Sequence, residues 1–181
     1  MNRAIDDLMH EHTAILEGLQ VLDGIADLME RGGSVDEADI SDILGFLKVF
    51  ADRCHHGKEE EYLFPALLMA GISEQDVSIP ALLSEHARGR ELLGAMEAAT
   101  FPKLRPAEFM SAVHGYTDLL DAHIRKENTM LFPLAEKLLT VHQAEELFEA
   151  FEAHEATVVG KGKHDELHLL LVRLRARYAG P

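Results

Sequence analysis

The feature that most constrains this chain is an internal repeat, in which one histidine–glutamate pattern occurs twice. Residues 55–65 follow the pattern His-x3-Glu-x3-Leu-Phe-Pro, and residues 123–133 follow it again with the same spacing. A Glu-His pair precedes each copy, with its histidine at position 12 in the first half and at position 86 in the second. Such a repeat predicts two similar halves, each carrying one His followed by His-x3-Glu.

Apolar residues around the repeat recur every three or four positions, as in a helix that buries one face. In the first segment this pattern includes Ile5, Leu8, Ile15, Leu19 and Leu22, with His12 among them. The pattern predicts long helices over residues 3–31, 36–70, 78–99 and 106–139. Glycines after residues 31 and 70 and the Phe101-Pro102 pair are helix-ending signals. Pro65 and Pro133 fall late in their helices and should kink them.

No segment shows the alternating pattern of a half-buried strand. Leu, Ala, Glu and Met are abundant, which favours helices. Four long helices with short connections predict an all-α fold, an up-down-up-down four-helix bundle over residues 1–139. Residues 140–181 lie outside the repeat. Helical patterns over 141–159 and 165–178, with a Gly-Lys turn between them, predict a C-terminal helical hairpin packed on the bundle.

The repeated residues suit a metal centre in the core of the bundle. Residues four apart on a helix project from one face, so each His-x3-Glu can direct a nitrogen and a carboxylate to one point. The expected ligands are His12, His55, Glu59, His86, His123 and Glu127. Two buried glutamates without a cation would be strongly unfavourable, whereas two metal ions sharing carboxylates would use the whole set. A donor set of nitrogen and oxygen without thiolate suits iron, with zinc or manganese as alternatives.

Several other residues admit competing interpretations. His56 and Glu60 form an i, i+4 pair offset by one residue, but the shared Leu-Phe-Pro sequence favours His55 and Glu59. In the C-terminal segment, Glu155, His164 or His168 either covers the open end of the site or belongs to a hairpin with exposed histidines; the second is favoured. Tyr62 and Tyr116 are interpreted as core residues, although either hydroxyl is close enough in the helical register to reach a ligand. Cys54 is expected to be a buried thiol.

Charge and composition exclude several classes of protein. The formal net charge of −15 argues against nucleic acid and anionic membranes as partners, because both require a cationic surface. No apolar run approaches the roughly 20 residues needed to span a bilayer, and the first residues lack the apolar core of a signal peptide. One cysteine allows no internal disulfide, and a cytoplasmic location is expected.

These residues resemble the hemerythrin-like family, also called the HHE cation-binding domain. The signature of that family is His on the first helix, His-x3-Glu on the second, His on the third and His-x3-Glu on the fourth, and residues 3–139 match it. The resemblance implies a four-helix bundle that holds two non-heme iron ions, oxo- or hydroxo-bridged, with Glu59 and Glu127 as bridging carboxylates.

The chain departs from the respiratory oxygen carriers of the same superfamily. They have a second histidine four residues after the ligand of the third helix, where this chain has Arg90. They also have His-x4-Asp on the fourth helix, where this chain has Asn128 at the Asp position. The expected site therefore has four His and two Glu, which argues against simple reversible carriage of O2.

Three functions are consistent with this site. The first is a di-iron protein that interacts with O2 or peroxide, in a redox response or in iron handling, with peroxide decomposition or oxidase activity as its enzymatic form. The second is a sensing or binding module in which the metal alters helix packing without turnover. The third is a structural metal site, with zinc as the expected ion. The chain is expected to be a monomer or a homodimer.

Overall fold

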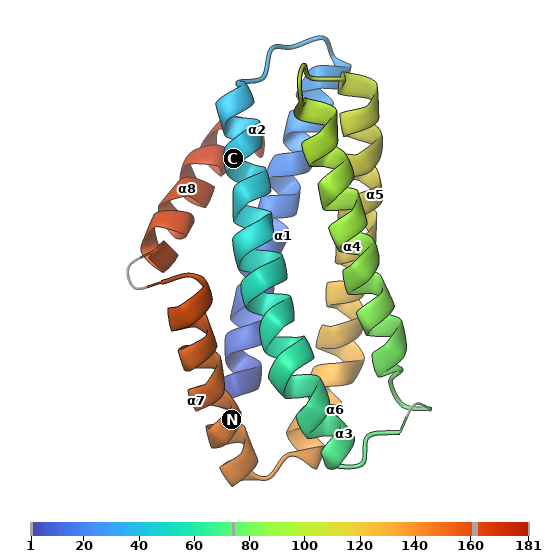
Figure 1. Cartoon of the computed structure of the whole chain (residues 1–181), viewed down its shortest axis with the longest axis vertical. Helices are drawn as coiled ribbons and strands as arrows, with labels where there is room; N and C mark the ends of the chain where they lie inside the picture. The colour runs from blue at the N-terminus through green and yellow to red at the C-terminus, as the bar shows by residue number, and fades with distance from the viewer. Residues whose placement is uncertain (1, 74, 161–162, 181) are drawn as a thin grey trace.

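The computed structural model describes residues 2–73, 75–160 and 163–180, with side chains in the last range from residue 166 onward. Every regular element of these residues is helical, and no strand occurs among them, which confirms the all-α fold. Four long helical runs lie side by side, and consecutive runs are joined at alternate ends of the molecule (Figure 1).

The first run is α1 (Arg3–Glu30) and the third is α4 (Ile79–Thr100). The second run comprises α2 (Glu37–Phe46), η1 (Leu47–His56), η2 (Glu59–Leu63) and α3 (Phe64–Met69). The fourth run comprises α5 (Pro106–Lys126), η3 (Glu127–Leu131) and α6 (Phe132–Leu138). Two further helices follow, α7 (Val141–Val158) and α8 (Lys163–Tyr178). The η segments have π-helical winding, in which an N–H bonds the carbonyl five residues earlier.

Helix ends follow the local sequence signals. The side chains of Asn2, Asp36 and Ser78 accept hydrogen bonds from the first-turn N–H groups of α1, α2 and α4. Gly32 and Gly71 have φ values of 74° and 86°, which an L side chain rarely adopts, and they follow the first and second runs.

The two prolines of the repeat follow π-helical segments in both halves of the molecule. Pro65 and Pro133 lie in the first turn of α3 and of α6. Because proline has no N–H and crowds the preceding turn, the winding before it widens. The N–H of Phe64 therefore bonds the carbonyl of Glu59, and that of Phe132 bonds the carbonyl of Glu127. The expected kink is thus a change of winding that begins at the repeated glutamates.

The core has two apolar clusters with a polar layer between them. One cluster includes Ile15, Leu22, Phe46 and Leu93, and the other includes Leu8, Leu63, Leu82 and Phe132. On α1, His12 lies between residues of the two clusters, and on α4 His86 does the same. His12 and His86 therefore lie at one level of the bundle, with apolar side chains on either side of them along the bundle axis.

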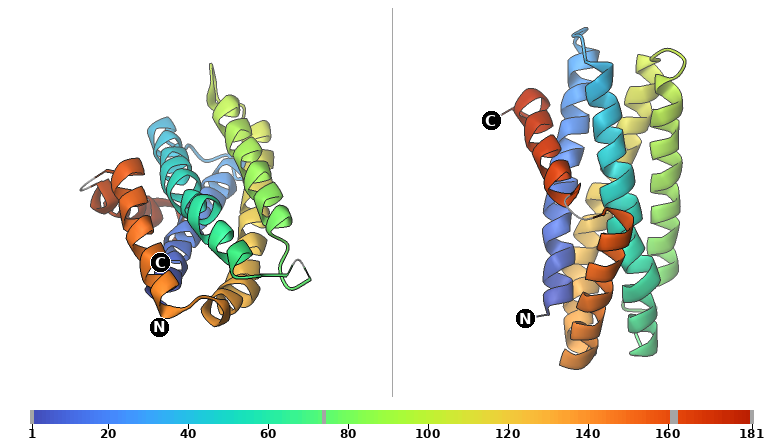
Figure 2. Two further views of the ribbon diagram at one scale, coloured as in Figure 1. Left: turned by 60° about the horizontal axis from the view of Figure 1, so that its bottom comes forward. Right: turned by 60° about the vertical axis from the view of Figure 1, so that its left-hand side comes forward.

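The C-terminal helices differ from the expected hairpin. Glu155 of α7 contacts Lys58 beside the first turns of α1, whereas Arg175 of α8 pairs with Glu17 farther along α1. The two helices lie one after the other along α1 and run in its direction (Figure 2). The sequence pattern indicates two helices and a turn but not their direction. Ion pairs between distant residues, such as Arg177 with the buried Asp39, hold α8 against the bundle, and they leave no local signal in the sequence.

Among the described helices, none combines the length and the apolar character that crossing a membrane requires.

Candidate metal centre

The polar layer of the bundle brings all six expected ligands together. Each of the four histidines has an exposed fraction of 1% or less, and both glutamates have 0%. Donor atoms within 4.8 Å of one another form two groups of buried residues. The first group is His12, His55, Glu59 and Glu127, and the second is His56, His86, His123 and Glu59. Glu59 belongs to both groups, so its carboxylate lies where two metal positions would meet.

Distances within the layer show that the histidine Nε2 atoms face the carboxylates. Nε2 of His12 and Nε2 of His123 each lie 3.3 Å from Oε2 of Glu127. Nε2 of His86 lies 3.4 Å from Oε2 of Glu59, and Nε2 of His55 lies 3.7 Å from Oε1 of the same residue. Each carboxylate therefore faces imidazoles from two different helical runs.

A fifth imidazole, that of His56, also enters the layer, beside the four expected histidines. His56 is 3% exposed, and its ring stacks on that of His86 with a centroid separation of 3.9 Å. In the sequence, the shared Leu-Phe-Pro motif favours His55 over His56, and adjacent side chains of an α-helix diverge by about 100°. Both belong to the π-helical η1, whose wider turn reduces that divergence. A buried His-His pair at the end of an apolar face is the signal that would have identified it.

The outer ring nitrogens are held in a pattern that repeats in the two halves. Nδ1 of His55 lies 2.8 Å from Glu11, and Nδ1 of His123 lies 2.8 Å from Glu85. Both acceptors directly precede the helix-one and helix-three histidines in the sequence. Likewise, Nδ1 of His12 lies 2.8 Å from Asn128, and Nδ1 of His86 lies 2.7 Å from Glu60. Asn128 and Glu60 directly follow the repeated glutamates.

This arrangement sets the tautomer of the imidazoles. A ring whose Nδ1–H donates to a carboxylate or amide oxygen presents the lone pair of Nε2 on the other side. The Nε2 atoms of His86 and His123 lie 3.0 Å apart, so two lone pairs point at one location. A cation must lie between such atoms, either a proton or a metal ion.

The two buried carboxylates also require a cation beside them. All four carboxylate oxygens of Glu59 and Glu127 are buried and lack a hydrogen bond within the described part of the chain. Burial disfavours a charged imidazole, yet the nearby carboxylates of Glu59 and Glu60 outweigh it and raise the pKa of His86 to about 9, whereas burial lowers the pKa of His55, His56 and His123. Buried carboxylates and imidazole lone pairs that converge in this way would be satisfied by divalent cations. The donor set therefore fits a metal pair.

Arg90 stands where the oxygen carriers have a histidine, and it organises one side of the site. Its guanidinium lies 2.6 Å from Asp52 and 2.7 Å from Glu60. Glu60 holds His86, and Oδ1 of Asp52 lies 3.6 Å from Nδ1 of His56. One cation thus fixes the carboxylates beside two imidazoles of the second group.

We expect Arg90→Leu to weaken metal binding at the second group by roughly tenfold, since loss of an outer partner releases the ligand it orients. Arg88→Leu is the matched control, because Arg88 lies on the same helix and pairs with the exposed Glu91. Titration of the metal-free proteins with Mn²⁺, followed by paramagnetic resonance, measures both. Equal affinities in the two variants would contradict this role of Arg90.

The other candidate residues lie away from the ligand atoms. Glu155 contacts Lys58 and belongs to neither of the two histidine-containing donor groups. His168 is exposed on α8, and the side chain of His164 is outside the described residues. Tyr62 packs against Phe151 and His154 of α7. Tyr116 is buried in the apolar cluster above the layer, and burial raises the pKa of its hydroxyl. Cys54 is 1% exposed, as expected of a buried thiol.

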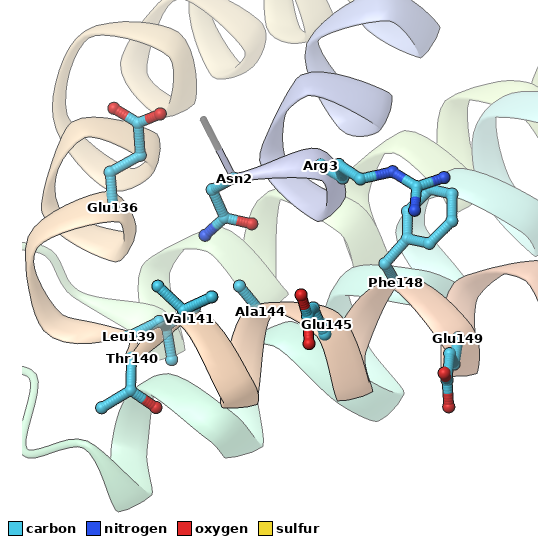
Figure 3. Close-up of a pocket in the computed structure, with 10 residues that line it drawn as sticks. All are labelled: Asn2, Arg3, Glu136, Leu139, Thr140, Val141, Ala144, Glu145, Phe148 and Glu149. Atoms are coloured by element: carbon cyan, nitrogen blue, oxygen red, sulfur yellow. The ribbon is translucent and has the colours of Figure 1, made fainter.

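A surface pocket of about 500 Å³ lies between the start of α1, the end of α6 and α7 (Figure 3). The guanidinium of Arg3 lies 3.9 Å from the ring centroid of Phe148 on its wall. No histidine lines this pocket, so it is separate from the metal centre.

Comparison with known proteins agrees with the residue pattern. The model of the hemerythrin HHE cation-binding domain matches residues 3–135. Uncharacterized proteins of Mycobacterium tuberculosis (strain H37Rv) and Mycobacterium bovis are each 28% identical over 158 residues, which cover 84% of this chain. The chain spans 61% of the length of these relatives. No solved structure matches the chain. The family match covers the described donor residues of both groups, and the chain therefore belongs to the hemerythrin HHE cation-binding family.

Proposed function

We propose that this protein holds two non-heme iron ions and interacts with O2 or peroxide. The observation that carries the proposal is the pair of buried donor groups that share Glu59. One ion would be held by His12, His55 and Glu127, and the other by His56, His86 and His123, with Glu59 contributing to both. In this proposal the four helical runs form an up-down-up-down bundle, and all the donor residues lie at one level along its axis.

Imidazole and carboxylate donors without thiolate support iron over copper(I), with zinc and manganese as competitors. Cys54 is not among the donors of either group, and burial raises the pKa of its thiol to about 12, so it stays protonated. Since a lone buried thiol is typical of a reducing compartment, we place the protein in the cytoplasm. We also propose that it is a monomer or a homodimer.

A bound iron pair would supply the electrons for reactions with O2 or peroxide. The residues of the chain bind and orient it. The outer acceptors, such as Glu11 and Glu85, keep the Nε2 lone pairs directed inward. The apolar clusters on either side of the layer restrict access of water, so reactive species are shielded from bulk solvent.

His56→Phe is expected to leave one metal ion per chain, because it removes a donor from the second group only. Phenylalanine keeps the ring that stacks on His86, so packing is preserved. Inductively coupled plasma mass spectrometry after desalting measures the stoichiometry, with His142→Phe on the exposed face of α7 as control. Two tightly held ions in His56→Phe would exclude His56 from the ligand set.

Optical spectroscopy of the iron-loaded protein tests the proposed chemistry. The proposal predicts near-ultraviolet bands of an oxo- or hydroxo-bridged iron pair that change on addition of O2 or peroxide. Rapid decay of peroxide to O2 and water would assign the enzymatic form, whereas stoichiometric binding without turnover would assign the sensing form. Spectra that neither oxidant changes would refute the proposed interaction with O2 or peroxide.

A further inference from the structure

Lys58 is a fully buried lysine one residue before the shared ligand Glu59. Its exposed fraction is 0%, and its Nζ lies 2.7 Å from Glu11, 2.8 Å from Asp7 and 3.3 Å from Glu155. Burial opposes the charged form, but the attraction of Glu11 and Asp7 outweighs it and raises the pKa of Lys58. Through these three ion pairs Lys58 joins α1, the second run and α7.

This cation connects α7 to a ligand of the metal centre. Glu155 contacts Lys58, Lys58 contacts Oε1 of Glu11, and Oε2 of Glu11 holds Nδ1 of His55 at 2.8 Å. Every link in this series is a charged hydrogen bond, and such bonds are stronger than neutral ones. Residues 3–135 match the family, so α7 lies beyond the matched region.

In the other half of the bundle, none of the described helices covers the matching lysine, Lys126. There Lys126 pairs with Glu85, which holds His123, so the inner part of the arrangement is repeated. Lys126 is 35% exposed, whereas Lys58 is covered by α7. The symmetry of the repeat is therefore broken by α7 on the side of His55.

Close packing fixes α7 at this position. Nε2 of His154 donates to the carbonyl of Arg53 at 3.0 Å, within the turn that precedes His55. A Cβ placed on Gly57 would lie 2.6 Å from the same nitrogen, so this helix approaches the metal-binding run as closely as a glycine permits. Glu155 thus reaches Lys58 from a helix with a defined position.

We propose that α7 helps to position a ligand of the metal centre. Its residue Glu155 acts through Lys58 and Glu11 to fix the orientation and the donor strength of His55. Glu155 offsets part of the charge of Lys58, which leaves Glu11 a stronger acceptor for Nδ1–H of His55. A more strongly held Nδ1–H makes Nε2 a better donor. Glu155 is therefore a positioning residue, and the inference rests on the proposed function only for its effect on the metal.

The direct test needs no metal. We expect Glu155→Gln to move the Nδ1–H proton resonance of His55 upfield in ¹H–¹⁵N spectra of the metal-free protein, because its hydrogen bond to Glu11 weakens. The corresponding resonance of His123, in the half without a covering helix, should not move. Glu152→Gln, at an exposed position of the same helix, is the control. An unchanged His55 resonance, or equal shifts in His55 and His123, would overturn the proposal whether or not iron is the native metal.

The second readout uses the metal-loaded protein. Glu155→Gln should weaken the first group, which contains His55, by roughly tenfold, at the lower end of the effect of outer partners. Glu11→Gln should weaken it more, since Glu11 contacts His55 itself. The second group should keep its affinity within about twofold in both variants. Equal weakening of both groups by Glu155→Gln would indicate general destabilisation and would contradict the proposed role.

Discussion

Glu59→Ala is expected to remove both metal ions, whereas Glu127→Ala should disrupt the pair and leave one ion behind. Both side chains are fully buried in the polar layer, but Glu59 belongs to both donor groups and Glu127 to only one. Without Glu59 the second group keeps only imidazoles, which carry no charge to offset that of a cation, and the first group keeps Glu127 as its one charged donor. Metal analysis after dialysis should give almost no metal for Glu59→Ala and about one ion per chain for Glu127→Ala, because loss of a ligand should cost more than the roughly 10–100-fold in affinity that loss of an outer partner costs.

Glu61→Ala is the control for these variants, because Glu61 lies in the same turn with its side chain 61% exposed. It should retain the full stoichiometry of the unmodified protein. Circular dichroism must show that all three variants stay helical. Retention of two ions by either Glu59→Ala or Glu127→Ala would show that the substituted carboxylate is not needed to hold the pair.

Removal of the metal should lower the melting temperature by an amount on the order of 10 °C. An ion present at 1,000 times its dissociation constant stabilises the folded state by about 4 kcal/mol, and each kcal/mol shifts Tm by about 2–4 °C at this chain length. Chelation also leaves Glu59 and Glu127 with buried oxygens that make no hydrogen bond within the described residues. Scanning calorimetry with and without a chelator measures the difference.

The double variant Glu59→Gln, Glu127→Gln separates these two contributions. It should be more stable than the unmodified protein when both are metal-free, because neutral amides replace two buried charges. It should gain no stability on addition of metal. A metal-dependent rise in Tm of the usual size in this variant would show that the ion binds elsewhere.

Most of the fold and the convergence of six donor residues could be predicted because the decisive information is local and repeated. The spacing of His55 and Glu59 places both on one face of a helix, and the matching pair His123 and Glu127 makes chance agreement improbable. Likewise, Gly32 and Gly71 follow the first and second runs as a local glycine signal predicts. These inferences need only the geometry of single helices.

The features that the sequence did not reveal depend on contacts between distant segments. His56 enters the layer from η1, whose π-helical winding is not signalled by the apolar pattern of the sequence. Lys58 and Glu155 are in contact although they lie 97 positions apart in the sequence. Either residue alone resembles an ordinary surface charge. The direction of α8 depends on pairs such as Arg177 with Asp39. None of these leaves a periodic pattern in the sequence.

The metal content of the protein purified from iron-replete cells tests the central claim most directly. We predict about two iron ions per chain, together with near-ultraviolet absorption of a bridged pair, as two groups sharing one carboxylate require. Stoichiometric zinc that excess Fe²⁺ does not displace would contradict the di-iron centre.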